Sequence, residues 1–125
     1  MLKRILAATV VLAFAALPLV AQQPKQAPAS NEVTLTGQVI DVSCYTVMGA
    51  SGPGHKQCAL ACSKSGEPLA ILSDGVIYVP VSSKPSDPQN PRLEPFAEGK
   101  VKVTGAHRMK DGLHTIEIKT IAAAA

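Results

Sequence analysis

Stretches of alternating apolar and polar residues run through most of the chain and predict a β-protein. Three long stretches have this period of two, and they cover residues 32–42 (EVTLTGQVIDV), 100–109 (KVKVTGAHRM) and 114–121 (HTIEIKTI). Two shorter apolar segments cover residues 69–73 and 76–81. Asp74-Gly75 and Asp111-Gly112 separate neighbouring segments, and both dipeptides are typical of two-residue hairpin turns. The pattern therefore predicts five strands, of which the last four form two hairpins.

Two short helical segments interrupt this β pattern. Residues 55–65 (HKQCALACSKS) are rich in helix formers and end before Gly66, and residues 93–98 can form one helical turn. The segments 43–54 and 82–92 are rich in glycine or proline and are expected to be loops. Five strands with a helix between the third and the fourth is the order of an OB-fold barrel. We therefore predict an all-β fold, a five-stranded OB-fold-like barrel with a short helical insertion after the first strand. A half-open SH3-like barrel is the main alternative.

The N-terminal residues have the composition of an export signal. Lys3 and Arg4 precede an apolar run that is shorter than the ~20 residues a membrane-spanning helix needs. No stable membrane span is therefore expected after cleavage, and the protein is expected to be secreted or periplasmic. The predicted parts are a signal peptide (1–21), a disordered linker (22–31), the folded domain (32–121) and a frayed tail (122–125).

The charge of the chain does not favour a nucleic-acid partner. The formal charge is +3, and removing the predicted signal peptide leaves ten basic and nine acidic residues. The chain has no tryptophan and only two tyrosines, too few for platforms on which bases stack. Five basic residues do gather in the last predicted hairpin: Lys100, Lys102, Arg108, Lys110 and Lys119. We interpret them as a solvated face that discourages edge pairing, with binding of an anionic ligand as the alternative.

All the cysteines and one histidine lie in one short segment, DVSCYTVMGASGPGHKQCALAC. If residues 55–65 are helical, His55, Cys58 and Cys62 are spaced i, i+3 and i+7 and lie on one face. Cys44 follows the first strand and can fold over that face. The four side chains form a Cys3His set that suits Zn²⁺, and their soft sulfur atoms also suit Cu(I).

Asp41 and the three cysteines allow other interpretations as well. Asp41 is either a carboxylate that orients His55 behind the ligand set or a residue that ends the strand and holds the following turn. A disulfide between Cys44 and either Cys58 or Cys62 would leave one spare thiol and would stabilise the fold by about 3 kcal/mol. Cysteines of exported proteins tend to pair, so this structural alternative stays open beside the metal site.

No enzymatic motif supports a catalytic role. The chain lacks a C-x-x-C motif beside a βαβ unit, so a thioredoxin-like enzyme is unsupported. His55 and Cys58 can be written as a base and a nucleophile, but no third group that would orient them is evident. The segment GASGPG lacks the Lys-Ser/Thr of a phosphate-binding loop. We therefore predict no catalytic residue, and a thiol redox role is the weakest of the hypotheses.

His107 and His114 stand on either side of the last predicted turn. If they pair across the hairpin, they are expected to be near neighbours. We interpret them as solvated hairpin residues, with a second metal site as the alternative.

Two parts of the sequence resemble known bacterial proteins. The tail EGKVKVTGAHRMKDGLHTIEIKTI, together with EPLAILSDGVIYVPV, resembles periplasmic proteins with an OB-fold, in which a G-K-x-V-x-V-x-G strand precedes the last hairpin. The pattern TGQVIDVSCY…GHKQCALAC…GEPLAIL is similar to a group of small secreted bacterial proteins of uncharacterised function, through its D-x-x-C and H-x-x-C-A-x-x-C motifs. The resemblance implies export and a small barrel, and it implies no particular activity.

These observations favour an exported small binding module whose Cys/His cluster holds a soft metal ion, either Zn or Cu. The alternative is a structural or interaction domain whose insertion is pinned by a disulfide and holds no metal. The sequence indicates no natural partner for either.

Overall fold

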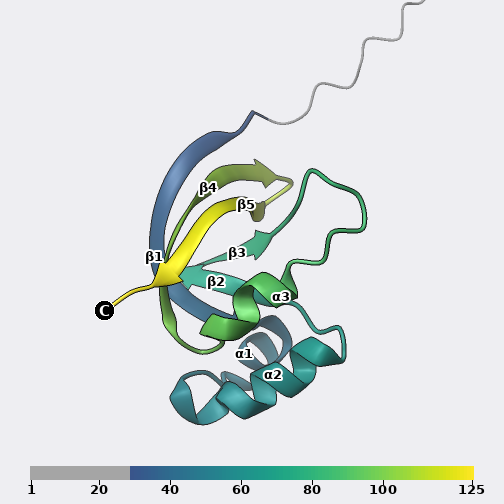
Figure 1. Ribbon diagram of the computed structural model, residues 1–125, viewed down its shortest axis with the longest axis vertical. Coiled ribbons are helices and arrows are strands. Elements are labelled where there is room, and N and C mark those ends of the chain that lie inside the picture. The colour runs from purple at the N-terminus through teal and green to yellow at the C-terminus, as the bar shows by residue number, and fades with distance from the viewer. Residues whose placement is uncertain (1–28) are drawn as a thin grey trace, which may run out of the picture.

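The computed structural model describes residues 29–125, and the predicted signal peptide with most of the predicted linker lies outside the described residues. Five strands form a closed barrel in which neighbours follow the order β1-β2-β3-β5-β4. They are β1 (Asn31–Asp41), β2 (Leu69–Ser73), β3 (Val76–Pro80), β4 (Lys100–Lys110) and β5 (Leu113–Ala123). With a short helical segment between β3 and β4, this order confirms the predicted five-stranded OB-fold-like barrel (Figure 1).

The segment between β1 and β2 is more helical than the sequence predicts. It holds α1 (Val42–Met48), the 3-10 turn η1 (Pro53–His55) and α2 (Lys56–Lys64). The prediction of a loop over residues 43–54 is therefore wrong for residues 43–48. Asp41 begins α1 because its Oδ1 accepts a hydrogen bond from the backbone N–H of Cys44 at 3.0 Å. Gly49 ends α1 in the left-handed conformation, with φ of 66°.

A second helical segment lies between β3 and β4, where the sequence predicts one short helix. It consists of α3 (Asn90–Leu93) and the 3-10 turn η2 (Glu94–Phe96). Figure 1 shows α1, α2 and α3 gathered at the lower end of the barrel, away from the turn between β4 and β5. At the C-terminus the predicted frayed tail is wrong for Ala122 and Ala123, because both residues extend β5 and pair with β4.

Aliphatic side chains from strands and helices form one core inside the barrel. Its buried members are Val39, Ala59, Leu69, Ile71, Leu93, Val101, Val103, Ile116 and Ile118. Ala59 comes from α2 and Leu93 from α3, so apolar contacts fix both helices to the barrel. The insertion that carries the cysteines is thus part of the folded domain.

Barrel closure requires β1 to curve from one neighbouring strand to the other, and a glycine lies where it does so. Gln38 pairs with Leu72 of β2 and also with Lys100 of β4, so β1 is shared by two neighbours at this point. A Cβ on Gly37 would lie 2.4 Å from the carbonyl oxygen of Leu72, which leaves no room for a side chain. On the far side, a short parallel pairing between β3 and β5 completes the barrel.

Gly105 marks a second bend, where the register of β4 against β5 shifts between Thr104 and Gly105. A Cβ on Gly105 would lie 2.4 Å from the carbonyl oxygen of Glu117. We therefore expect Gly105→Ala to lower the free energy of unfolding by about 1–3 kcal/mol through overpacking. Gly54→Ala is the matched control, because a Cβ there meets no atom within 4 Å. Urea denaturation compares the two variants, and equal losses would contradict this explanation of the bend.

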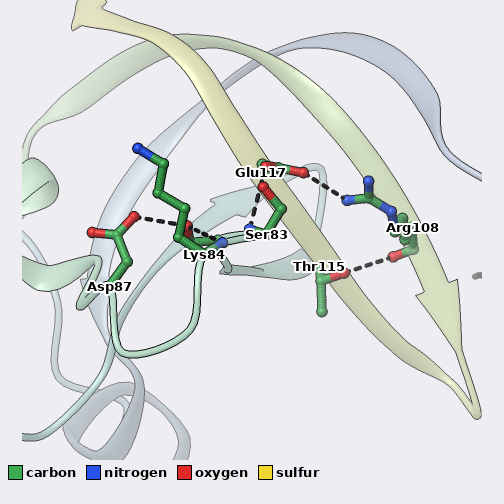
Figure 2. Close-up of polar contacts among 7 residues, drawn as sticks. Ser83, Lys84, Asp87, Arg108, Thr115 and Glu117 are labelled. Carbon is green, nitrogen blue, oxygen red and sulfur yellow. Dashed lines mark hydrogen bonds and ion pairs between the residues drawn. The ribbon is translucent and has the colours of Figure 1, made fainter.

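The proline-rich segment 82–92 is tied to the outer face of β5 by polar contacts (Figure 2). The backbone N–H of Ser83 donates to Oε1 of Glu117 at 3.3 Å, and Arg108 forms an ion pair with Oε2 at 3.1 Å. Hydrogen bonds from Ser83, and then the Arg108 guanidinium, lower the pKa of Glu117. Lys119 forms an ion pair with Glu32. Two of the five basic residues of the last hairpin are therefore already paired with acids, and an anionic ligand there stays a prediction.

Candidate metal centre

The structure brings the predicted cysteines and histidine together at the helical end of the barrel. Cys44 lies on α1, His55 ends η1, and Cys58 and Cys62 lie on α2. They form two overlapping groups that share Cys44, namely Cys44/His55/Cys58 and Asp41/Cys44/Cys62. Within each group the potential ligand atoms all lie within 4.8 Å of one another. All three cysteines, which belong to the described residues, are free thiols. The predicted Cys/His cluster is thus confirmed as a cluster, and the disulfide alternative is not formed.

The His55 ring is held in one orientation by a buried carboxylate. Its Nδ1 lies 2.9 Å from Oε1 of Glu98, and the two side chains are 13% and 0% exposed. Because a carboxylate accepts hydrogen bonds, Nδ1 is the nitrogen that carries the proton. In the neutral imidazole the other nitrogen, Nε2, then has a free lone pair, and it is buried without any hydrogen-bond partner. A buried acceptor that is left unpaired costs free energy, and a bound metal ion would satisfy it.

Glu98 is itself fixed by several contacts. Its Oε2 accepts hydrogen bonds from the backbone N–H of Gly52 at 2.7 Å and from Nε2 of Gln38 at 3.0 Å. Its backbone N–H donates to the carbonyl oxygen of Val39 at 2.9 Å. Its φ is 60°, a left-handed conformation that a residue other than glycine adopts at a cost of about 1–3 kcal/mol. The prediction that Asp41 orients His55 is therefore corrected, because the carboxylate on the His55 ring is that of Glu98.

Asp41 has a different place, beside the thiols. The residue is fully buried; its Oδ1 caps α1, and its Oδ2 has no hydrogen-bond partner. Burial alone would raise the pKa of this carboxyl, but the N–H of Cys44 and the nearby thiols of Cys62 and Cys44 together lower it. Asp41 is thus an anion in the neutral pH range, and it lies within ligand distance of Cys44 and Cys62.

The anion of Asp41 in turn keeps two thiols protonated. Its carboxylate, followed by burial, raises the pKa of Cys62 from 9.0 to about 12. Burial, followed by Asp41, raises the pKa of Cys44. Binding of a metal by these thiolates must therefore release protons.

Thiol alkylation of the metal-free protein tests these shifts. We expect iodoacetamide at pH 8 to modify the exposed Cys58 first and Cys62 much more slowly, because the thiolate is the reactive form. The rate at Cys62 should keep rising with pH above 9, toward its pKa of about 12. Since folding raises this pKa, the protonated thiol stabilises the fold below pH 9, and this stabilisation is lost as the pH rises toward 12. Mass spectrometry of the peptides measures each rate, and equal rates at Cys58 and Cys62 would contradict the account.

Hydrogen bonds that involve no thiol hold the ligand-bearing segment in place. Oγ of Ser63 on α2 donates to Oε1 of Glu94 at 2.8 Å. The Asn90 amide nitrogen donates to the carbonyl oxygen of Glu67 at 2.7 Å, and its oxygen accepts from the N–H of Leu69 at 3.0 Å. These contacts join α2 and the start of β2 to the helical segment between β3 and β4. These hydrogen bonds therefore help to position the segment that carries the candidate ligands.

Comparison with known proteins does not assign this chain to a family. No protein-family model, no curated protein and no solved structure matches it. The resemblance to small secreted bacterial proteins therefore stays a prediction, and the function has to be inferred from the geometry of the centre. Within residues 29–125, the structure contains no helix with the length and apolar character of a membrane span.

The second histidine cluster is confirmed as a pair of neighbours. Nε2 of His107 lies 3.0 Å from Nδ1 of His114, and the two rings are nearly parallel, with an interplanar angle of 6°. The Tyr78 ring contacts both of them edge-on. In the part of the chain that the structure describes, no third cysteine, histidine or carboxylate joins this pair as a ligand. One ring donates its N–H to the other, so these two ring nitrogens are already hydrogen-bonded to each other. The pair therefore gives the second metal site no further support.

Proposed function

We propose that the protein is an exported small binding module that holds one soft metal ion, Zn²⁺ or Cu(I), at the Cys/His centre. The observation that carries this proposal is the buried Nε2 of His55. It has a free lone pair and no partner, and it belongs to the ring that lies with Cys44 and Cys58. Glu98 behind the ring supplies the carboxylate–histidine arrangement that typically orients a metal-bound imidazole.

The composition of the centre favours soft metals over hard ones. Three sulfur atoms and one imidazole are ligands that Zn²⁺ and Cu(I) prefer, whereas Mg²⁺ and Ca²⁺ prefer oxygen ligands. Cys44, His55 and Cys58 would supply three ligands, and Cys62 from the overlapping group would supply a fourth after a small movement. A three-ligand set suits Cu(I), and a four-ligand set suits tetrahedral Zn²⁺.

The surroundings of the centre favour a carrier or sensor over a purely structural site. In small domains that need zinc to fold, metal binding supplies the folding free energy. Here the ligand-bearing segment is already fixed by Ala59 in the core and by the hydrogen bonds of Ser63 and Asn90. The metal-free protein is therefore expected to stay folded. It can then bind and release the metal reversibly without unfolding. The N-terminal pattern supports export to a compartment outside the cytoplasm.

A competition titration of the reduced protein tests the proposal. Zn²⁺ or Cu(I) is added in the presence of a chromophoric chelator, and one equivalent is expected to bind. His55→Ala should weaken binding strongly, whereas His107→Ala, which removes a histidine of the other pair, should leave it unchanged. If neither metal binds, or if the two variants behave alike, the proposal is wrong. The disulfide-pinned structural domain would then be the better account, and the oxidised protein should show the higher unfolding midpoint.

A further inference from the structure

The four candidate ligands differ sharply in their access to solvent. Cys44 is buried, with 6% of its surface exposed, and the His55 side chain is 13% exposed. Cys62 is half-buried, and Cys58 is exposed. A metal held by Cys44, His55 and Cys58 therefore has two ligands on the inner side of the centre and one on the outer side.

The inner ligands are also held by neighbouring groups, whereas the outer one is not. Glu98 holds the His55 ring, and the Asp41 carboxylate lies beside Cys44 and Cys62. Cys58 makes no hydrogen bond to any residue of the described part of the chain through its side chain. It is exposed on α2, whereas Ala59 of the same helix is buried in the core. Cys58 is thus the ligand whose release disturbs the fewest contacts.

The segment that carries the cysteines has exposed lysines and is followed by an exposed glutamate. Residues 42–66 contain no aspartate or glutamate, and they carry Lys56 and Lys64, which are exposed. The carboxylates that contact the candidate ligands, Asp41 and Glu98, are buried. Glu67, which follows this segment directly, is exposed and accepts a hydrogen bond from Ser43, so the exposed charges near the segment are of both signs.

From this asymmetry we infer that Cys58 is the exchange ligand, through which the centre passes its metal to an acceptor thiolate. The inference rests on the proposed metal-binding function and names the chemistry of its partner. The acceptor thiol loses its proton as its sulfur bonds to the metal, and the bond between the metal and Sγ of Cys58 breaks. The Cys58 thiolate then takes up a proton, so no electron is transferred and no oxidant is needed. Cys44 and His55 retain the metal until a second acceptor ligand displaces them.

The experiment follows metal transfer from the loaded full domain to glutathione while free thiols are trapped with short pulses of iodoacetamide. Doubling the glutathione concentration is expected to double the rate of metal loss, because the incoming thiolate takes part in the slow step. Cys58 should be the first cysteine alkylated, before Cys44 and Cys62. His107→Ala, which changes only the separate histidine pair, is the control, and it should keep both the concentration dependence and the early alkylation of Cys58.

Two results would overturn the inference while leaving the metal site intact. One is a rate of metal loss that does not depend on glutathione. The other is first alkylation of Cys44 or Cys62. Failure of the proposed function would look different, because the wild-type protein would then take up no metal at all. A parallel arm with a two-cysteine peptide separates the sources of the acceptor thiolate, since faster extraction by the peptide indicates a protein acceptor and faster extraction by glutathione a small thiol.

Discussion

Replacing Cys44 with alanine is expected to weaken metal binding more than a hundredfold. Its sulfur is the only one that belongs to both ligand groups, so the change removes a ligand from each. Structural Zn²⁺ sites bind with about 10–16 kcal/mol, or roughly 3 kcal/mol for each of four ligands, which corresponds to a factor above about 100 in affinity. Competition titration with Zn²⁺ and with Cu(I) measures the loss.

Cys62→Ala is the control for the Cys44 variant. It also removes one thiol from the same segment, but it leaves the Cys44/His55/Cys58 group complete. The metal affinity of this variant should therefore fall less than that of Cys44→Ala. The difference between the two variants should be largest for Cu(I). Equal losses in the two variants would show that Cys44 is not the shared ligand. Circular dichroism of both metal-free variants should match that of the wild type, because Ser63, Asn90 and Ala59 still hold the segment.

Replacing Glu98 with glutamine is expected to lower metal affinity by about 10–100-fold, the usual effect of losing the partner of a metal-bound histidine. The neutral amide keeps the size of the side chain but no longer offers a carboxylate to Nδ1 of His55. The ring is then free to carry its proton on Nε2, the nitrogen that the metal needs. Titration measures the affinity, and nitrogen NMR of the His55 ring measures which nitrogen carries the proton.

Glu94→Gln is the matched control for the Glu98 variant. Glu94 is a glutamate at the helical end too, partly buried where the side chain of Glu98 is fully buried, but its carboxylate accepts a hydrogen bond from Ser63 and does not contact His55. This variant is expected to alter stability slightly and to leave metal affinity and the His55 tautomer unchanged. If both glutamine variants lose affinity to the same degree, the role assigned to Glu98 is wrong.

Most of the fold could be predicted because its signals are local. Alternating residues and the Asp-Gly turns indicated five strands, and each lies where expected to within a few residues. Gly37 and Gly105 stood out within strands, and both lie at close backbone approaches. The missed element is α1, whose sequence is rich in β-branched residues and is followed by glycines. Its capping by Asp41 and the left-handed Gly49 outweighs the weak helix propensity of the residues between them.

The candidate centre could be predicted only in part, for the same reason. The spacing of His55, Cys58 and Cys62 is a local signal, and Cys44 lies close to them in the sequence. Glu98 is 43 residues away from His55, and before Gly99 it resembles an ordinary helix end. Only the closed barrel brings it to the ring, since Glu98 and Gly99 pair with the backbone of Val39 in β1. The left-handed conformation of a buried glutamate is the structural sign of its role.

The most direct test of the metal centre is the native intact mass of the protein, purified without reductant or chelator. The account predicts a mass raised by one Zn or Cu ion, with Cys44 and Cys58 open to alkylation only after the metal is removed. A mass lower than that of the reduced chain by two hydrogen atoms, with one thiol alkylated and no metal present, would contradict it. The three cysteines would then form a disulfide with one spare thiol, and the buried Nε2 of His55 would need another explanation.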